Sequence, residues 1–129
     1  METPLLDYGG SVNKKVEYKI KEDGSGIELK SFELGGLKLK VEQVIQYRPW
    51  NWGKIIPGAG QVGIYKLRLP DGGEKFALIK DYKAAEGDWR IFLIYLTNTE
   101  RELKDKLWVD GNYGALFIDY LDPEVFDDY

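Results

Sequence analysis

The chain has 129 residues, of which 43% are hydrophobic, 14% aromatic and 31% charged, and its net charge is −4. This size and apolar content fit one folded domain and argue against a disordered chain. The chain contains no Cys and no His. Their lack excludes disulfides, zinc sites with nitrogen or sulfur ligands, and catalysis by the commonest general base.

The N-terminal residues contain no basic region and no long apolar stretch, and no apolar run approaches the roughly 20 residues of a membrane helix. We therefore expect a cytoplasmic protein, located in the host cytoplasm if the chain is viral. Thermolabile residue types are scarce while Lys and Glu are abundant, which resembles the composition of hyperthermophile proteins. A thermophile source, viral or archaeal, fits this bias.

Alternating apolar and polar residues, or short apolar runs, predict seven strands. They cover residues 16–22, 27–34, 37–48, 62–69, 74–83, 89–97 and 114–121. Turn signals such as Asp23-Gly24 separate them. A shift of the apolar phase between Leu29 and Phe32 predicts a bulge. The almost wholly apolar run 89–97 predicts a central strand that is buried on both faces.

One short helix is predicted near residues 99–108. Thr99 and Glu102 have the spacing of a capping box, in which each residue satisfies a backbone N–H at the helix start. Leu103 and Leu107 are four residues apart and therefore share one apolar face. Asp110 and Gly111 end the helical pattern.

No strand–helix–strand alternation occurs in this order, so the sheet should be antiparallel. We predict a mainly β fold, an antiparallel small barrel or sandwich of about seven strands with one short helix. Residues 1–121 form this single β-rich domain, and residues 122–129 form an acidic C-terminal tail. Residues 1–109 carry 18 basic and 16 acidic side chains, hence +2, whereas residues 110–129 carry six acids and no base, hence −6.

The stretch GAGQVG, residues 58–63, fits the Gly-x-Gly-x-x-Gly pattern of phosphate-binding loops. A dinucleotide site needs a helix after the glycines, but a strand pattern follows here. The hairpin and strand from residue 56 to 80 resemble the glycine-rich loop of protein kinases, which implies a phosphate site. Its residues would be Gly58, Gly60, Gly63 and Lys80.

This resemblance does not extend to kinase catalysis. Leu78 replaces the small alanine beside the adenine site, no His-Arg-Asp or Asp-Phe-Gly motif occurs, and only 49 residues follow Lys80. We interpret the glycines as a turn in a β protein and expect no cofactor. Asp119, Asp122 and Glu124 could hold a hard cation, but a solvated acidic cluster is the commoner case. We predict no catalytic residue and no metal site.

The most unusual segment is QYRPWNWGK, residues 46–54, which places two tryptophans in a Pro/Gly loop. They form either a lid on the end of the sheet or a stacking platform beside cationic side chains. The strands before and after this loop carry Lys and Arg opposite their apolar residues. These cations also fit an ordinary Lys/Glu solvent face. The predicted ligand-binding set is Arg48, Trp50, Trp52, Lys54, Lys38, Lys40, Lys66 and Arg68.

The C-terminal segment DYLDPEVFDDY carries five acids and ends in an aromatic residue. It is similar in style to the acidic tails of several bacterial and phage single-strand-binding proteins. That resemblance implies a tail that competes with nucleic acid or recruits a partner protein. Alternatively, Val125, Phe126 and Tyr129 pack on the domain or on a second subunit.

These features predict a non-catalytic binding protein that binds single-stranded nucleic acid through the tryptophan loop and the Lys/Arg strands. The alternatives are a structural or protein–protein interaction domain and a carbohydrate-binding module. A homodimer formed through an exposed sheet edge is compatible with each of them.

Overall fold

The computed structural model describes residues 3–4, 16–24, 26–49, 60–83 and 89–121. Their strands form one antiparallel sheet in the order β1-β7-β6-β5-β4-β3-β2, so strands β2 to β7 follow one another as a meander. The strands are β1 (Thr3–Pro4), β2 (Val16–Ile20), β3 (Ile27–Leu34), β4 (Leu37–Pro49), β5 (Gly60–Arg68), β6 (Glu74–Lys83) and β7 (Trp89–Thr97).

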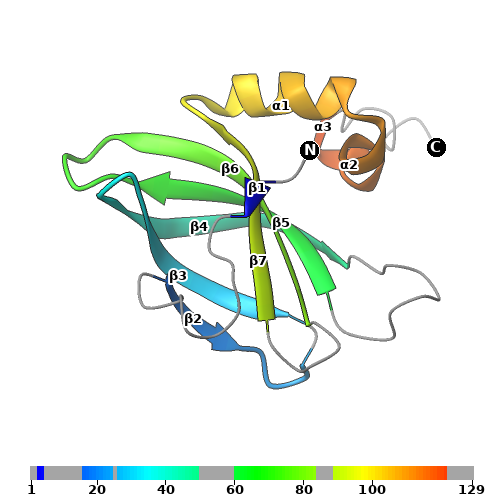
Figure 1. The fold of residues 1–129 in the computed structure, drawn as a ribbon. Helices are drawn as coiled ribbons and strands as arrows, with labels where there is room; N and C mark the ends of the chain where they lie inside the picture. The colour runs from blue at the N-terminus through cyan, green and yellow to red at the C-terminus, as the bar shows by residue number, and fades with distance from the viewer. Residues whose placement is uncertain (1–2, 5–15, 25, 50–59, 84–88, 122–129) are drawn as a thin grey trace.

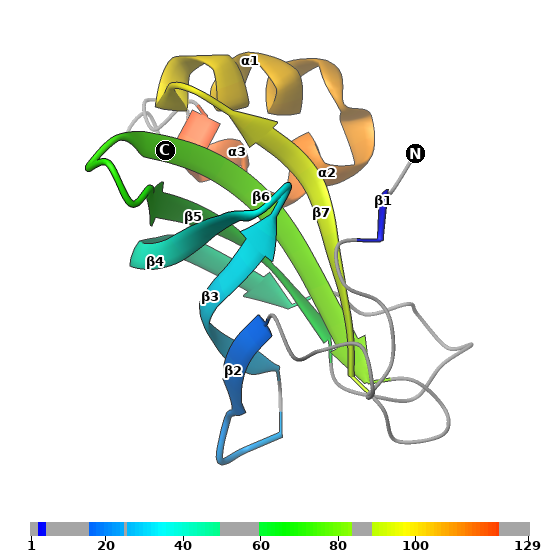
Figure 2. The ribbon, with the colours of Figure 1, turned by 60° about the vertical axis from the view of Figure 1, so that its left-hand side comes forward.

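The sheet curls into a half-barrel, as Figures 1 and 2 show. Its inner face encloses one apolar core, in which Val16 of β2 and Phe32 of β3 belong to the same cluster as Tyr65 of β5 and Ile91 of β7. Strands from opposite ends of the meander therefore pack on each other across the curl. The prediction of a mainly β, antiparallel, barrel-like fold is confirmed.

In the described part of the chain, three helices cover part of the outer face of the sheet (Figure 1). They are α1 (Glu100–Val109), α2 (Gly111–Leu116) and α3 (Ile118–Leu121). Leu103 and Leu107 of α1 are fully buried against Ile64 and Leu78 of the sheet, which forms a second core. Within the described residues, no helix is long and apolar enough to cross a bilayer.

The predicted helix near residues 99–108 is confirmed with its cap. Thr99 is the N-cap residue, and its hydroxyl oxygen accepts from the Glu102 backbone N–H at 3.2 Å. The Thr99 hydroxyl in turn donates to the Glu102 carboxylate at 3.0 Å. Asp110 ends the helix, and its N–H donates to Lys106 O at 3.1 Å.

The strand predicted over residues 114–121 is wrong, because this segment is helical in α2 and α3. The Asp110 carboxylate accepts from the backbone N–H groups of Asn112 and Tyr113 and so starts α2. Tyr113 and Phe117 are both buried and are four residues apart, a spacing that places them on one face of a helix. The apolar residues of this segment satisfy both patterns, and packing on α1 selects the helix.

The predicted bulge in residues 27–34 is confirmed. Glu17 pairs with Ser31 and Tyr18 with Leu29, so Lys30 is an extra residue on β3. The prediction that 89–97 is a central strand buried on both faces is wrong, because in the described part of the chain the outer neighbour of β7 is the two-residue β1, and most side chains of β7 are only partly buried. β5 and β6 occupy the middle of the sheet, where one face meets the inner core and the other meets the helices.

Candidate functional site

The predicted strand cations lie on the outer face, opposite the buried Leu39 and Leu67. Lys66 contacts the carboxylates of Glu42 and Glu74 at 3.2 and 2.9 Å. Arg68 contacts the same two carboxylates. Each glutamate therefore faces two cations, and the four side chains largely neutralise one another.

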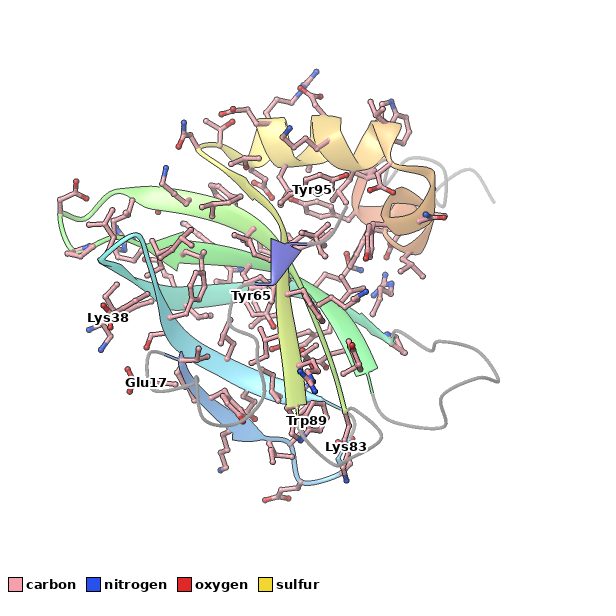
Figure 3. The ribbon with its side chains drawn as sticks, viewed as in Figure 1. Glu17, Lys38, Tyr65, Lys83, Trp89 and Tyr95 are labelled. Carbon is pink, nitrogen blue, oxygen red and sulfur yellow. The ribbon has the colours of Figure 1, made fainter. Side chains whose placement is uncertain are left out.

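Lys38, Lys40 and Arg68 are brought together around a hollow of about 380 Å³ between two hairpins. Lys38 forms an ion pair with Glu17 at 3.0 Å, and Figure 3 shows both at the same side of the sheet. The Lys38 contact and the Ser31 hydroxyl bond lower the pKa of Glu17, with the hydroxyl contributing most. Within the described residues, Lys40 forms no ion pair.

Arg48 connects β4 to the C-terminal helices. Its guanidinium contacts Asp119 at 2.5 Å and donates to Leu116 O at 3.0 Å. Desolvation raises the pKa of Asp119, but the hydrogen bonds from Gln46 and Arg48 outweigh it, and the pKa is lowered overall. The other members of the predicted loop site, Trp50, Trp52 and Lys54, lie outside the described residues, as do Asp122 and Glu124.

The interpretation of the kinase-like glycines as a turn is wrong where they are described, because these glycines are part of a strand. Gly60 and Gly63 belong to β5, and Gly63 pairs with Tyr47 and Ile79 on either side. A Cβ at Gly63 would lie 2.9 Å from the Tyr47 ring, so close ring packing explains this glycine. Gly58 lies outside the described residues.

Lys80 is fully buried in β6, with its ammonium 5.7 Å from the centre of the Phe92 ring and 6.0 Å from that of Tyr82. The described part of the pattern therefore lies within the sheet rather than in a phosphate-binding loop.

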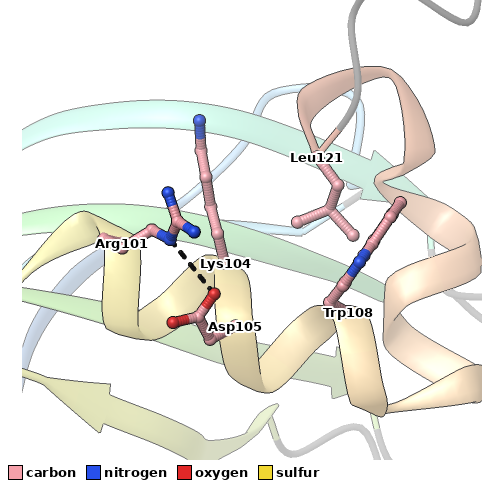
Figure 4. Close-up of a pocket in the computed structure, with 5 residues that line it drawn as sticks. All are labelled: Arg101, Lys104, Asp105, Trp108 and Leu121. Atoms are coloured by element: carbon pink, nitrogen blue, oxygen red, sulfur yellow. Dashed lines mark hydrogen bonds and ion pairs between the residues drawn. The ribbon is translucent and has the colours of Figure 1, made fainter.

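A different surface combines an exposed indole with cationic side chains. Trp108 is 60% exposed on α1, whereas Trp89 of β7 is buried. The exposed Trp108 lines a groove of about 310 Å³, which we call the α1 groove (Figure 4). The α1 groove is lined by Arg101, Lys104, Asp105, Trp108 and Leu121.

Helical periodicity builds the α1 groove. Residues 101, 104, 105 and 108 are three or four positions apart, which places them on one face of α1. Leu103 and Leu107 hold the opposite face of α1 against the sheet. Leu121, at the end of α3, completes the groove beside Trp108 (Figure 4).

The two cations of the α1 groove contact different kinds of side chain. The Lys104 ammonium lies 4.6 Å from the centre of the Tyr120 ring. The Tyr120 hydroxyl donates to Glu100 at 2.5 Å, and burial together with this bond raises the pKa of Tyr120. Arg101 contacts Asp105 at 3.2 Å, with both side chains highly exposed. An exposed pair of this kind contributes little and is readily exchanged for another anion.

Asp110 fixes the corner between α1 and α2. Its carboxylate accepts from the Tyr95 hydroxyl at 2.6 Å and from two N–H groups of α2. Burial raises the pKa of Asp110, but these hydrogen bonds outweigh burial and lower it overall. The same contact raises the pKa of Tyr95, which lies beneath α1 in Figure 3, to about 12.

Gly114 allows α2 to approach α1 closely. A Cβ at this position would lie 2.1 Å from the Leu107 carbonyl oxygen. No larger residue fits without moving α2. The distance between the two helices, and with it the shape of the α1 groove, therefore depends on this glycine.

No protein-family model, curated protein or solved structure matches the chain. The α1 groove was not among the predicted sites. Its signal is present in the sequence, since Trp108 follows Leu107 directly and so cannot share the apolar face of Leu103 and Leu107.

Proposed function

We propose that the protein is a non-catalytic binding protein for single-stranded nucleic acid and that the α1 groove is its principal contact. The observation that carries this proposal is the 60% exposed Trp108 on the same helical face as Arg101 and Lys104. Proteins that bind single strands combine aromatic side chains, on which bases stack, with cations that follow the phosphates.

The groove geometry favours an unpaired base as the stacked group. One face of a flat ring can cover the Trp108 indole, with Leu121 at its side. The volume of about 310 Å³ is at the lower end of ligand pockets, which suits one base better than a paired segment. In a duplex, the base faces are already covered by their neighbours. Single strands are therefore the preferred ligand.

The phosphate contacts come from few cations. Arg101 and Lys104 stand against one acid, Asp105, in the groove, so the electrostatic part of binding is small. Lys40, which forms no ion pair within the described residues, is proposed as a further contact to the nucleic-acid backbone, from the separate hollow between two hairpins. In our proposal, Trp50, Trp52 and Lys54, which lie outside the described residues, also contribute to binding.

The proposal is tested by titrating a fluorescein-labelled oligothymidylate of about 12 nucleotides and its duplex with oligoadenylate, at about 50 and 200 mM salt. We expect tighter binding of the single strand, a loss of affinity at the higher salt, and quenching of tryptophan fluorescence. Equal affinity for both forms, no binding at the lower salt, or affinity that ignores salt would contradict it.

A protein partner is the second candidate, favoured by the apolar pair at the end of α1. Val109 is 87% exposed and adjoins the exposed Trp108, and aromatic residues are enriched at protein interfaces. This candidate predicts association that survives 200 mM salt and is lost on Val109→Asp. Nucleic-acid binding through the indole and the cations should tolerate that substitution better.

A further inference from the structure

The hairpin strands β3 and β4 diverge soon after their turn. They pair only over residues 31–34 and 37–40, after which β4 continues beside β5 and β3 beside β2 (Figure 1). A wedge of about 380 Å³ lies between them, and its lining includes Lys21, Leu29, Val44 and Tyr47. The sheet is therefore open along one internal seam.

Two side chains from the opposite wall of the half-barrel reach the divergent part of β3. The Gln61 amide donates to Ile27 O at 2.8 Å and to the Asp81 carboxylate at 3.1 Å. The Ile27 N–H also bonds to Asp81. Ile27 is paired with Ile20 of β2, but it has no partner on β4. The contacts with Gln61 and Asp81 replace the backbone hydrogen bonds that β4 would otherwise provide at Ile27.

Asp81 is fully buried, and its Oδ1 has no hydrogen-bond partner within the described residues. Burial raises its pKa to about 7, against the lowering effects of Gln61, Ile27 and Lys21. The Lys21 ammonium is held elsewhere, since it donates to Gln61 Oε1 at 2.8 Å and lies 3.9 Å from the centre of the Tyr47 ring. An ionised Asp81 would therefore be an incompletely compensated charge in the core.

The other groups around this carboxyl do not supply a positive charge. Tyr47 and Tyr65 face it from β4 and β5, and Ile91 is its register partner on β7. Burial raises the pKa of both tyrosines, so they are neutral near pH 7. Glu28 of β3 acts on Tyr47 and adds only negative charge. Lys21 is the one described cation that acts on Asp81.

We propose that Gln61 and Asp81 form a proton-controlled latch that holds β3 against β5 and β6 and so sets how far the wedge between β3 and β4 opens. The protonated carboxyl is neutral and is stable in the apolar interior. Ionisation favours the opened state, in which water reaches the carboxylate. The latch is a separate device from the α1 groove and does not depend on nucleic-acid binding.

The direction of the pH effect follows from proton linkage. In the opened state Asp81 has its ordinary pKa of 3.8, whereas in the latched state the pKa is about 7. The latched state therefore holds the proton more tightly, and opening becomes easier as the pH rises from about 4 to about 7. Above pH 7 both states are ionised and the effect levels off. Linkage gives an opening constant about 50-fold larger at pH 7 than at pH 5.

Amide hydrogen exchange of the full-length protein at pH 5 and 7 tests the latch, after correction for intrinsic exchange rates. The Ile27 amide should show the roughly 50-fold change, while the Asp110 amide at the end of α1, which exchanges by local fraying without exposing Asp81, should change less than about twofold. An unchanged Ile27 amide would overturn the latch. An equal change at both amides would also overturn it, because Asp81 would then act on the whole domain.

Two variants complete the test. Asp81→Asn should abolish the pH response of the Ile27 amide, and the exposed turn variant Asp71→Asn should keep it. If Asp81→Asn does not fold, carboxyl-carbon NMR of the wild-type protein decides. A midpoint for Asp81 near 7 that coincides with the Ile27 response supports the latch, and a midpoint near 4 refutes it.

Discussion

Two surfaces of the molecule carry clustered cations, and they differ in what those cations contact. On the uncovered outer face of the sheet, Lys66 and Arg68 share two glutamates. In the α1 groove, Lys104 lies over an aromatic ring and Arg101 contacts one exposed aspartate beside an exposed indole. Cations alone therefore do not define a phosphate-binding surface. The partners that the fold gives them decide whether they are free to bind a ligand.

The largest expected effect is the loss of the indole. Trp108→Ala should weaken oligothymidylate binding by about 1–3 kcal/mol, or roughly 5- to 150-fold, because one stacked base loses its platform. Trp108→Phe keeps a flat ring and should retain most of the affinity. Fluorescence anisotropy at about 50 mM salt measures both. Equal losses in the two variants would mean that stacking on this residue is not the source of affinity.

Replacing one lysine in the α1 groove and one on the outer face of the sheet compares the contributions of the two surfaces to binding. Lys104→Gln should reduce affinity about fivefold at 0.1 M salt and lower the slope of log K against log salt by about 0.7, the value for one phosphate contact on a single strand. Lys66→Gln should change neither, because Glu42 and Glu74 already neutralise Lys66. A larger effect of Lys66→Gln would reverse the ranking of the two surfaces.

Removing the carboxylates that pair with Lys66 and Arg68 should allow the outer face of the sheet to bind oligothymidylate. In the double variant Glu42→Gln and Glu74→Gln, Lys66 and Arg68 lose their carboxylate partners. Oligothymidylate binding should strengthen by about three- to fivefold near 50 mM salt, with a steeper salt dependence. The double variant Glu22→Gln and Glu33→Gln, which adds the same +2 charge outside both surfaces, serves as a control for net charge. No gain would show that the strand face cannot contact the ligand even when its cations are free.

The smallest effect is expected from the C-terminal residues. Residues 122–129 carry four acids and no base, so their removal lowers the repulsion between protein and phosphates. A chain that ends at Leu121 should bind about two- to threefold more tightly near 50 mM salt and equally at 300 mM, where screening is stronger. A version with the four acids replaced by Asn and Gln separates charge from length.

Local patterns in the sequence predict most of the strands, because alternation and turn signals are properties of neighbouring residues. The capped helix near Thr99 is predicted for the same reason. The segment 114–121 is not, since its apolar residues fit two periods and only contact with α1 distinguishes them. The pairing of Lys66 with Glu42 is likewise invisible, because it joins residues 24 positions apart through the register of β4 and β5.

In the candidate site, too, some features follow from local sequence and others depend on tertiary packing. Sequence patterns identify the residue types, an indole beside cations, but favour the loop at Trp50 and Trp52. Trp108 lies on a helix whose existence was predicted, and its exposure depends on how α1 is rotated on the sheet. Asp81 reads as an ordinary polar residue in β6, and only the curl of the half-barrel brings it to Ile27.

The corner at Asp110 has a consequence for how ligand contacts at α1 reach the rest of the domain. The Asp110 backbone N–H closes α1 by donating to Lys106 O, while the Asp110 carboxylate starts α2 and accepts from the Tyr95 hydroxyl of the sheet. The two helices therefore cannot unwind separately at this junction. Trp108 lies two residues before Asp110. A displacement of α1 on ligand binding at the indole would therefore reach β7 through the hydrogen bond between Asp110 and Tyr95. Because Asp110 joins both helices to β7, we expect the helices and the sheet to unfold in one cooperative transition. Loss of the Asp110 contacts should make that transition less cooperative.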